Sequence, residues 1–196
     1  MRRGFALALL ASLLIPAAAQ ATLLVYLSDE DLTAEADAVV QGEVLSVESY
    51  RDARRDRVFT WVTLGVSEYL KGHGPDEVIV RVAGGVVGDL EYRVLGAPQF
   101  TVGEEVVLFL QARTDANGVV GMIQGKLRVT TDERGEKWVT REIGGVALVA
   151  RDGRAPARPT RPMRFRLAEL RTIVSRVLPT LPATQQRALA GAPYSE

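Results

Sequence analysis

The stretch Gly103-Glu-Glu-Val-Val-Leu-Phe-Leu110 indicates the fold class of this 196-residue chain. Its last five residues, Val106 to Leu110, are all apolar and leave the segment without a polar side. A short run that is rich in β-branched and aromatic residues is typical of a strand buried on both faces. We therefore expect a sheet whose other strands pack around residues 104–111.

Two segments before this strand alternate between apolar and polar residues. From Ala38 to Ser49 the apolar phase slips near Gly42, which predicts a β-bulge or a sharp bend, as at the corner of a barrel. From Arg57 to Tyr69 the alternation predicts a long strand with one aliphatic side that faces the core. The opposite side is expected to carry Phe59, Trp61 and Tyr69. These aromatic residues either form a binding stripe or pack beneath a loop or helix.

Further strands complete a mainly β pattern. The predicted segments are residues 78–82, residues 119–130, and residues 138–143 followed by 146–149 after a break at Gly144-Gly145. Asn117-Gly118 predicts a hairpin turn over residues 115–118. Several short strands of this kind predict an OB-like small β-barrel, with a β-sandwich as the alternative.

The two ends of the chain carry different signals. Arg2 and Arg3 precede an apolar stretch that ends in Ala19-Gln20-Ala21, which predicts a secretory leader cleaved near Ala21. A retained membrane anchor is the alternative, but the apolar stretch is shorter than the roughly 20 residues that a bilayer span needs. Ser28 with Asp31 three residues later predicts a capping box at the start of a short helix. The expected organisation is a leader (1–21), a β-barrel domain (22–150), a Pro/Arg-rich linker (151–164), an amphipathic helix (165–179) and a disordered tail (180–196).

Composition and charge narrow the function classes. The absence of cysteine excludes disulfides and thiolate metal sites, and a single histidine, His73, excludes a site built on several histidines. No cofactor or metal is therefore expected. Residues 22–150 carry 13 basic and 21 acidic residues, a net charge of −8, whereas residues 151–196 carry 9 and 3, a net charge of +6. A nucleic-acid partner is not expected for the basic tail of a secreted chain.

Binding residues are sought first on a long excursion before the central strand. Long loops often carry function, and the segment 84–100 contains Tyr92, Arg93 and Phe100. No catalytic residue is assigned. His73 lies between two glycines without a nearby orienting carboxylate, and Glu104 and Glu105 are expected to point to opposite sides of a strand.

Four segments resemble a group of uncharacterised secreted bacterial proteins. They are Ala36-Asp-Ala-Val-Val-Gln-Gly-Glu-Val44, Glu68-Tyr-Leu-Lys-Gly72, Gly96-Ala-Pro-Gln-Phe-Thr-Val-Gly-Glu-Glu-Val-Val-Leu-Phe-Leu110 and Gly125-Lys-Leu-Arg-Val129. More distantly, residues 34–130 resemble the netrin-like module of tissue inhibitors of metalloproteinases, an OB-type five-stranded barrel. The resemblance implies a barrel and a secreted setting. Those inhibitors use an N-terminal cysteine that this chain lacks, so no inhibitory residue is carried across.

Together these observations predict a non-catalytic binding module of the periplasm or extracellular space. Its expected partner is another protein, with a secreted protease as one candidate. Two alternatives are an envelope-associated structural protein tethered by its C-terminal helix and a hydrolase of unknown type. Residues 165–179 are expected to dock on the chain's own barrel and close its open end, to dock on a partner, or to lie on a membrane surface.

Overall fold

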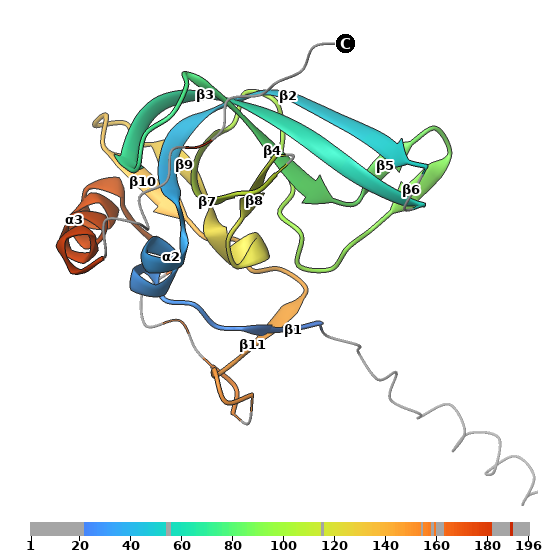
Figure 1. Ribbon diagram of the computed structural model, residues 1–196. Coiled ribbons are helices and arrows are strands. Elements are labelled where there is room, and N and C mark those ends of the chain that lie inside the picture. The colour runs from blue at the N-terminus through green and yellow to red at the C-terminus, as the bar shows by residue number, and fades with distance from the viewer. Residues whose placement is uncertain are drawn as a thin grey trace, which may run out of the picture.

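One curved eight-stranded sheet organises the chain (Figure 1). The computed structural model describes residues 22–53, 56–114, 116–153, 155–157, 159, 163–181 and 189. The strand order is β12 (Arg164–Arg166), β10 (Lys137–Thr140), β9 (Lys126–Thr131), β7 (Glu105–Ala112), β2 (Ala38–Asp52), β3 (Arg57–Lys71), β4 (Glu77–Ala83) and β8 (Asn117–Val119), and β8 also pairs with β7. The predicted mainly β class is confirmed.

Strand β7 lies at the centre of two hydrophobic clusters. All five residues from Val106 to Leu110 are completely buried. Val107 and Phe109 belong to one cluster, and Val106, Leu108 and Leu110 belong to the other. The prediction of a strand buried on both faces is confirmed, and the continuous apolar run follows from it because neither face contacts water.

The first cluster lies between the sheet and two helices, α2 (Asp29–Glu35) and α3 (Leu167–Val177). Both helices lie at the same side of the sheet in Figure 1. Leu32 of α2 and Leu170 of α3 are fully buried there beside Phe109. The second cluster is formed by the inward-facing aliphatic side chains of β2, β3, β4 and β7.

Helix α3 docks on the chain's own body through its apolar side. Leu167, Leu170, Ile173 and Val174 are buried in the first cluster. Of the three predictions for this helix, docking on the chain itself is observed, and it leaves those side chains inaccessible to a membrane surface or a tethering partner. Among the residues that the structure describes, no helix has the length and hydropathy that crossing a bilayer requires.

A β-bulge lies where the alternation of the sequence slips. The pairing of β2 with β3 shifts between Gln41 and Gly42, so that Gln41 faces Glu68 whereas Gly42 faces Val66. Ser67 is therefore the extra residue on β3, and the predicted bulge at Gly42 is confirmed. A side chain at position 42 would meet the Gly65 carbonyl oxygen, 2.2 Å from its Cβ.

The substitution Gly42→Ala is expected to destabilise the fold by about 1–3 kcal/mol, because the added methyl group overlaps backbone atoms that cannot rotate away. Urea unfolding measures the effect through the midpoint. Gly144→Ala is the matched control, since a Cβ there meets no atom within 4 Å. Equal urea midpoints for the two variants would contradict the close approach of β2 and β3 at Gly42.

One predicted turn and one predicted strand differ from the structure, and the predicted excursion contains an additional hairpin. The turn before β8 is closed by Arg113 N and Ala116 O at 3.2 Å, so Asn117-Gly118 belongs to the strand and not to a hairpin loop. The predicted strand 119–130 is interrupted by η2 (Met122–Gly125), a 3₁₀ turn entered through Gly121 at φ +65°. The excursion before β7 contains its own hairpin, β5 (Gly85–Val87) with β6 (Leu90–Tyr92).

The segment after the expected cleavage site forms a strand that sequence reasoning missed. Strand β1 (Thr22–Val25) pairs in parallel with β11 (Val146–Val149) in a separate two-stranded sheet. The break at Gly144-Gly145 thus separates β11 from the main sheet. The expected leader (1–21) and most of the expected tail lie outside the described residues. Leu189 is described and buried, and its N–H donates to the His73 carbonyl.

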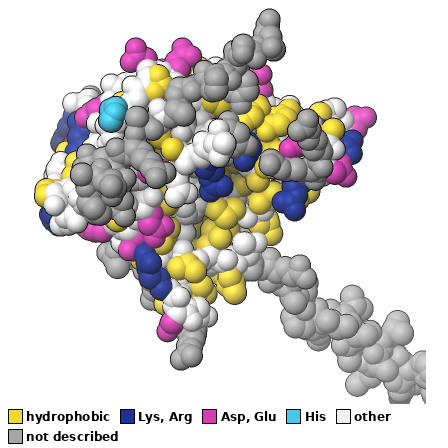
Figure 2. All heavy atoms as spheres, viewed as in Figure 1, with side chains coloured by type: hydrophobic (Ala, Val, Ile, Leu, Met, Phe, Trp, Pro, Cys, Tyr) yellow, Lys and Arg dark blue, Asp and Glu magenta, His cyan; other side chains and the backbone are white. Residues whose placement is uncertain are grey.

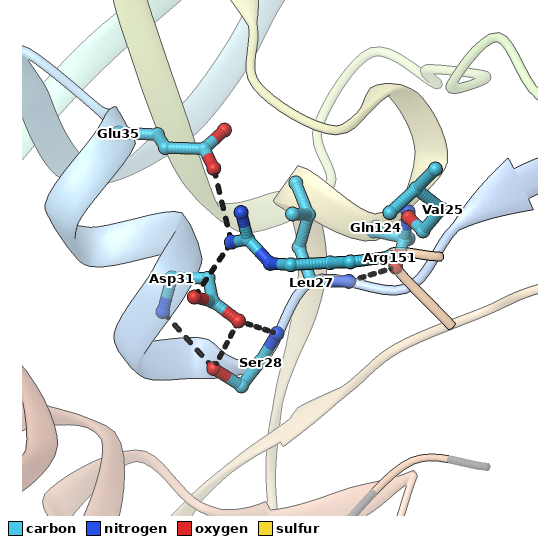
Figure 3. A network of polar contacts seen from close by, with 7 residues as sticks. All are labelled: Val25, Leu27, Ser28, Asp31, Glu35, Gln124 and Arg151. Carbon is cyan, nitrogen blue, oxygen red and sulfur yellow. Dashed lines mark hydrogen bonds and ion pairs between the residues drawn. The ribbon is translucent and has the colours of Figure 1, made fainter. Parts of the chain in front are cut away.

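A polar network joins β1, α2 and η2 (Figure 3). Gln124 accepts a hydrogen bond from Leu27 N at 3.0 Å and donates to Val25 O at 2.9 Å, which fastens the N-terminal segment to the body. Ser28 Oγ accepts from Asp31 N at 3.0 Å, while the Asp31 carboxylate accepts from Ser28 N. The predicted capping box is confirmed.

Asp31 gives the protein an acid-sensitive contribution to stability. Burial alone would raise its pKa, but hydrogen bonds from Ser28 and the Arg151 guanidinium, 2.7 Å away, lower the pKa below its usual value. A carboxyl whose pKa is lower in the folded than in the unfolded chain stabilises the fold above the unfolded pKa of about 3.9 and loses this contribution as the pH falls through the lowered value.

The substitution Asp31→Asn is therefore expected to reduce stability at pH 7 and to flatten the decline toward pH 2. Urea unfolding at a series of pH values tests this. Glu133→Gln, an exposed acid on the β9–β10 turn, is the control. If the stability of the variant declined with falling pH as steeply as that of the wild-type chain, other carboxyl groups would be the cause of the decline.

Candidate functional site

A small cavity lies where β3 and β4 meet the β7–β8 turn. Its volume is about 170 Å³. Its walls combine apolar and basic side chains, including Phe59, Arg81, Pro98, Arg113, Asn117 and Met122. In the space-filling view of Figure 2, hydrophobic side chains gather between the β5–β6 hairpin and β1, with Lys or Arg side chains beside them. We take this cavity and its aromatic border as the candidate site.

The aromatic border is a stack of side chains across β2, β3 and β4. Tyr50 lies opposite Phe59 in the pairing of β2 with β3, and Trp61 lies opposite Arg81 in the pairing of β3 with β4. The Tyr50 ring stacks on Trp61 with centroids 5.1 Å apart and on Phe59 at 6.0 Å. The Arg81 guanidinium carbon lies 5.0 Å from the Phe59 centroid and 6.0 Å from that of Trp61. Such contacts hold the guanidinium in place.

Sequence reasoning placed Tyr69 in the same stripe, and the structure corrects this. Tyr69 packs against the second cluster, with Val62 and Leu64, and its hydroxyl donates to Pro75 O at 2.8 Å. The extra residue at the bulge, Ser67, reverses the alternation between Val66 and Tyr69. Because side chains alternate with a period of two, one inserted residue moves every later side chain to the other face.

The side chain of Arg113 passes over Gly118 to line the cavity. A Cβ at Gly118 would lie 2.7 Å from Arg113 Nε, so the absence of a side chain at Gly118 leaves the path of the arginine open. Arg113 is itself exposed. Its guanidinium can therefore meet a ligand without first leaving a buried partner.

Asn117 is a buried polar residue in the wall of the cavity. It is only 2% exposed, and its Nδ2 donates to Ile79 O of β4 at 3.0 Å. Within the described part of the chain its Oδ1 has no hydrogen-bond partner. A buried acceptor in this state favours a ligand or a water molecule that can donate to it.

The predicted rim residues Tyr92, Arg93 and Phe100 lie on the adjoining surface but are not brought together in one pocket. Tyr92 and Arg93 line a cavity of about 430 Å³ beneath the β5–β6 hairpin, and Phe100 lines another of about 190 Å³. Arg93 is paired with Glu91 at 2.8 Å on the surface. Ala97 lines both the site and the larger cavity, so the excursion forms the wall between them.

A buried ion pair holds the end of that excursion. Lys126 Nζ donates to Glu104 Oε1 at 2.6 Å and to Gln99 O, and it lies 4.5 Å from the centroid of the Phe100 ring. Burial lowers the pKa of Lys126, and the Glu104 carboxylate opposes this shift. Glu105 instead contacts Gln41 and Lys137. The expectation that the two glutamates point to opposite sides is thus confirmed, and Glu104 acts by anchoring the loop.

The arrangement could bind a ligand through charge, aromatic stacking and one side-chain amide. Sequence reasoning missed three residues of the site: Arg81, Arg113 and Asn117. The only local signal was the position of the two arginines, since Arg81 lies within strand β4 and Arg113 directly follows strand β7. Within the described ranges, no three His, Cys, Asp or Glu side chains lie close enough to hold a metal ion. No known protein-family model matches the chain, and no curated protein is significantly similar to it.

Proposed function

We propose that this chain is a non-catalytic protein-binding module of OB type that acts outside the cytoplasm, in the periplasm or the extracellular space. The observation that carries the proposal is the cavity beside the Tyr50–Phe59–Trp61–Arg81 stack, a preformed surface that combines aromatic rings with guanidinium groups. Aromatic residues and arginine are enriched among the residues that dominate the energetics of protein interfaces, where aromatic rings contribute large contact areas and guanidinium groups contribute several hydrogen-bond donors.

The strand pairing supports the OB-type assignment. Five strands each pair with two others of the same set, in the order β2, β3, β4, β8 and β7. The pairing of β4 with β8 is parallel, and the others are antiparallel. OB folds bind ligands on the face of their second and third strands and on two flanking loops. In this chain the corresponding elements are β3, β4, the β2–β3 turn and the β7–β8 turn. The site lies against three of these four, since Phe59, Arg81 and Arg113 line it.

The expected partner is a protein of the same compartment, and a secreted protease is one candidate from the netrin-like resemblance. No observation on the described residues favours the tethered structural protein, because α3 buries its apolar side in the chain's own core. Beside β9, the Glu104 carboxylate pairs with Lys126 and the Glu142 carboxylate pairs with Arg128, and carboxylates engaged in this way do not favour a hydrolase.

Crosslinked capture from envelope and secreted fractions of the source organism tests this function. The baits are the wild-type protein, Arg81→Glu, and Arg134→Glu as the control. Arg134 is an exposed arginine on the β9–β10 turn and does not line the cavity. We expect one protein to be captured by the wild type and the control, and to be reduced at least tenfold with Arg81→Glu. Identical capture by all three baits would remove this surface as the binding site.

A further inference from the structure

We propose that the cavity between β3, β4 and β8 binds the C-terminal residue of a partner polypeptide, one that ends in an apolar amino acid. This inference rests on the protein-binding function proposed above and names the group that the site recognises. Three features of the cavity carry it: its charge, its size and its buried acceptor.

The charge of the cavity selects an anion. Arg81 and Arg113 both line it, and none of the described residues that line it is acidic. This basic spot lies on a body, residues 22–150, whose net charge is −8. A carboxylate is the anion that every polypeptide carries at its end, and it forms charge-assisted hydrogen bonds with guanidinium groups.

The size of the cavity selects a single residue. Its volume of about 170 Å³ is smaller than the roughly 300–1,000 Å³ of typical small-molecule sites. Phe59, Pro98 and Met122 give it apolar walls. One aliphatic side chain fits such a space.

The buried acceptor selects an N–H group beside the carboxylate. Asn117 Oδ1 has no hydrogen-bond partner among the described residues, and Asn117 Nδ2 is already engaged with Ile79 O. The C-terminal residue of a polypeptide carries a carboxylate, an apolar side chain and an amide N–H on one Cα. An internal aspartate or glutamate has the carboxylate at the end of its side chain and offers no apolar group there. The same chemistry occurs in a free N-acyl amino acid, so the experiment must separate these two sources.

The test titrates three probes into the full-length protein and follows the side-chain amide of Asn117 and the arginine Nε–H signals by NMR. The probes are a hexapeptide that ends in leucine with a free carboxylate, the same peptide as its C-terminal amide, and N-acetyl-leucine. We expect the free peptide to bind at least about tenfold more tightly than the amide, because the amide cannot form the charge-assisted hydrogen bonds. We also expect it to bind more tightly than N-acetyl-leucine.

Two variants examine the residues. Arg113→Gln is expected to reduce affinity for the free peptide about tenfold. Gly118→Ala is expected to reduce it as well, since the new Cβ displaces the Arg113 side chain without changing its charge. Arg134→Gln is the control and should bind as the wild type does. Because Arg113 is exposed and Gly118 has an ordinary negative φ, both variants are expected to fold.

Equal affinity for the acid and the amide, or no shift of the Asn117 signal with any probe, would overturn the inference. N-acetyl-leucine binding as tightly as the peptide would overturn the polypeptide source and assign the cavity to a small acyl amino acid. A captured partner that still binds after deletion of its last residue, in an Arg81-dependent manner, would refute the inference and leave the proposed function intact. Absence of Arg81-dependent capture would remove the proposed function itself.

Discussion

The substitution Phe109→Ala is expected to lower the free energy of unfolding by about 3–5 kcal/mol. Phe109 lies on the central strand β7, has no exposed surface, and packs between the sheet and the two helices in the first cluster. Truncation removes the transfer free energy of the ring and leaves a cavity, because the surrounding strands are fixed by their pairing and relax only in part. The loss is a large fraction of the 5–15 kcal/mol that typically stabilises a folded domain.

Urea unfolding followed by tryptophan fluorescence measures this effect, since Trp61 and Trp138 lie on strands of the main sheet. Phe109→Leu retains most of the volume and is expected to cost clearly less. Leu45→Ala is the exposed control on the neighbouring strand β2, where the side chain is 44% exposed, and should change stability little. Hydrogen exchange should show reduced protection of α3 in Phe109→Ala. A loss below about 1 kcal/mol would mean that the two helices do not depend on this core.

Features that depend on a few neighbouring residues were predictable from the sequence. The buried strand around Val106–Leu110 follows from an unbroken apolar run, and the helix start at Ser28 follows from a four-residue pattern. The irregular course of β2 near Gly42 follows from a slip in its alternation, although the extra residue opposite Gly42 lies on β3. Each of these signals lies within about ten consecutive residues, so it can be recognised without knowing which strands pair.

Features that depend on pairing across the chain were not predictable. The parallel pairing of β1 with β11 joins segments more than a hundred residues apart. Tyr69 was placed on the wrong face because a single inserted residue, Ser67, is recognisable only once the partner strand is known. Asn117-Gly118 has the sequence of a hairpin turn, but the contacts of Asn117 with Ala112 and Ile79 draw it into β8.

In the candidate site, too, some residues were predictable from local sequence and others only from strand pairing. Phe59 and Trp61 were indicated by alternation along one strand. Arg81 and Arg113 join them only because β4 and the β7–β8 turn meet at the same edge, which is a consequence of strand order. The arginines of a candidate site that is assembled from several strands therefore appear in the sequence as isolated residues.

The substitution Arg141→Met is expected to destabilise the fold by about 3–5 kcal/mol. Arg141 Nη2 lies 2.6 Å from Asp29 Oδ1, and the two side chains are only 4% and 2% exposed. Arg141 Nε also donates to Gln124 O at 2.9 Å. The methionine keeps much of the volume but leaves the Asp29 carboxylate buried without its guanidinium, and the desolvation cost of that charge is then no longer offset.

A double-mutant cycle tests whether the ion pair is the cause. Asp29→Leu combined with Arg141→Met removes both charges of the pair, and we expect the double variant to be more stable than Arg141→Met alone, because the buried carboxylate that lost the Arg141 guanidinium is then absent too. Arg93→Met is the control for a surface pair: Arg93 and Glu91 are 75% and 57% exposed, and the change should stay within about 1 kcal/mol. Additive losses in the double variant would show that Arg141 stabilises the fold by packing and by its bond to Gln124 O, and not through Asp29.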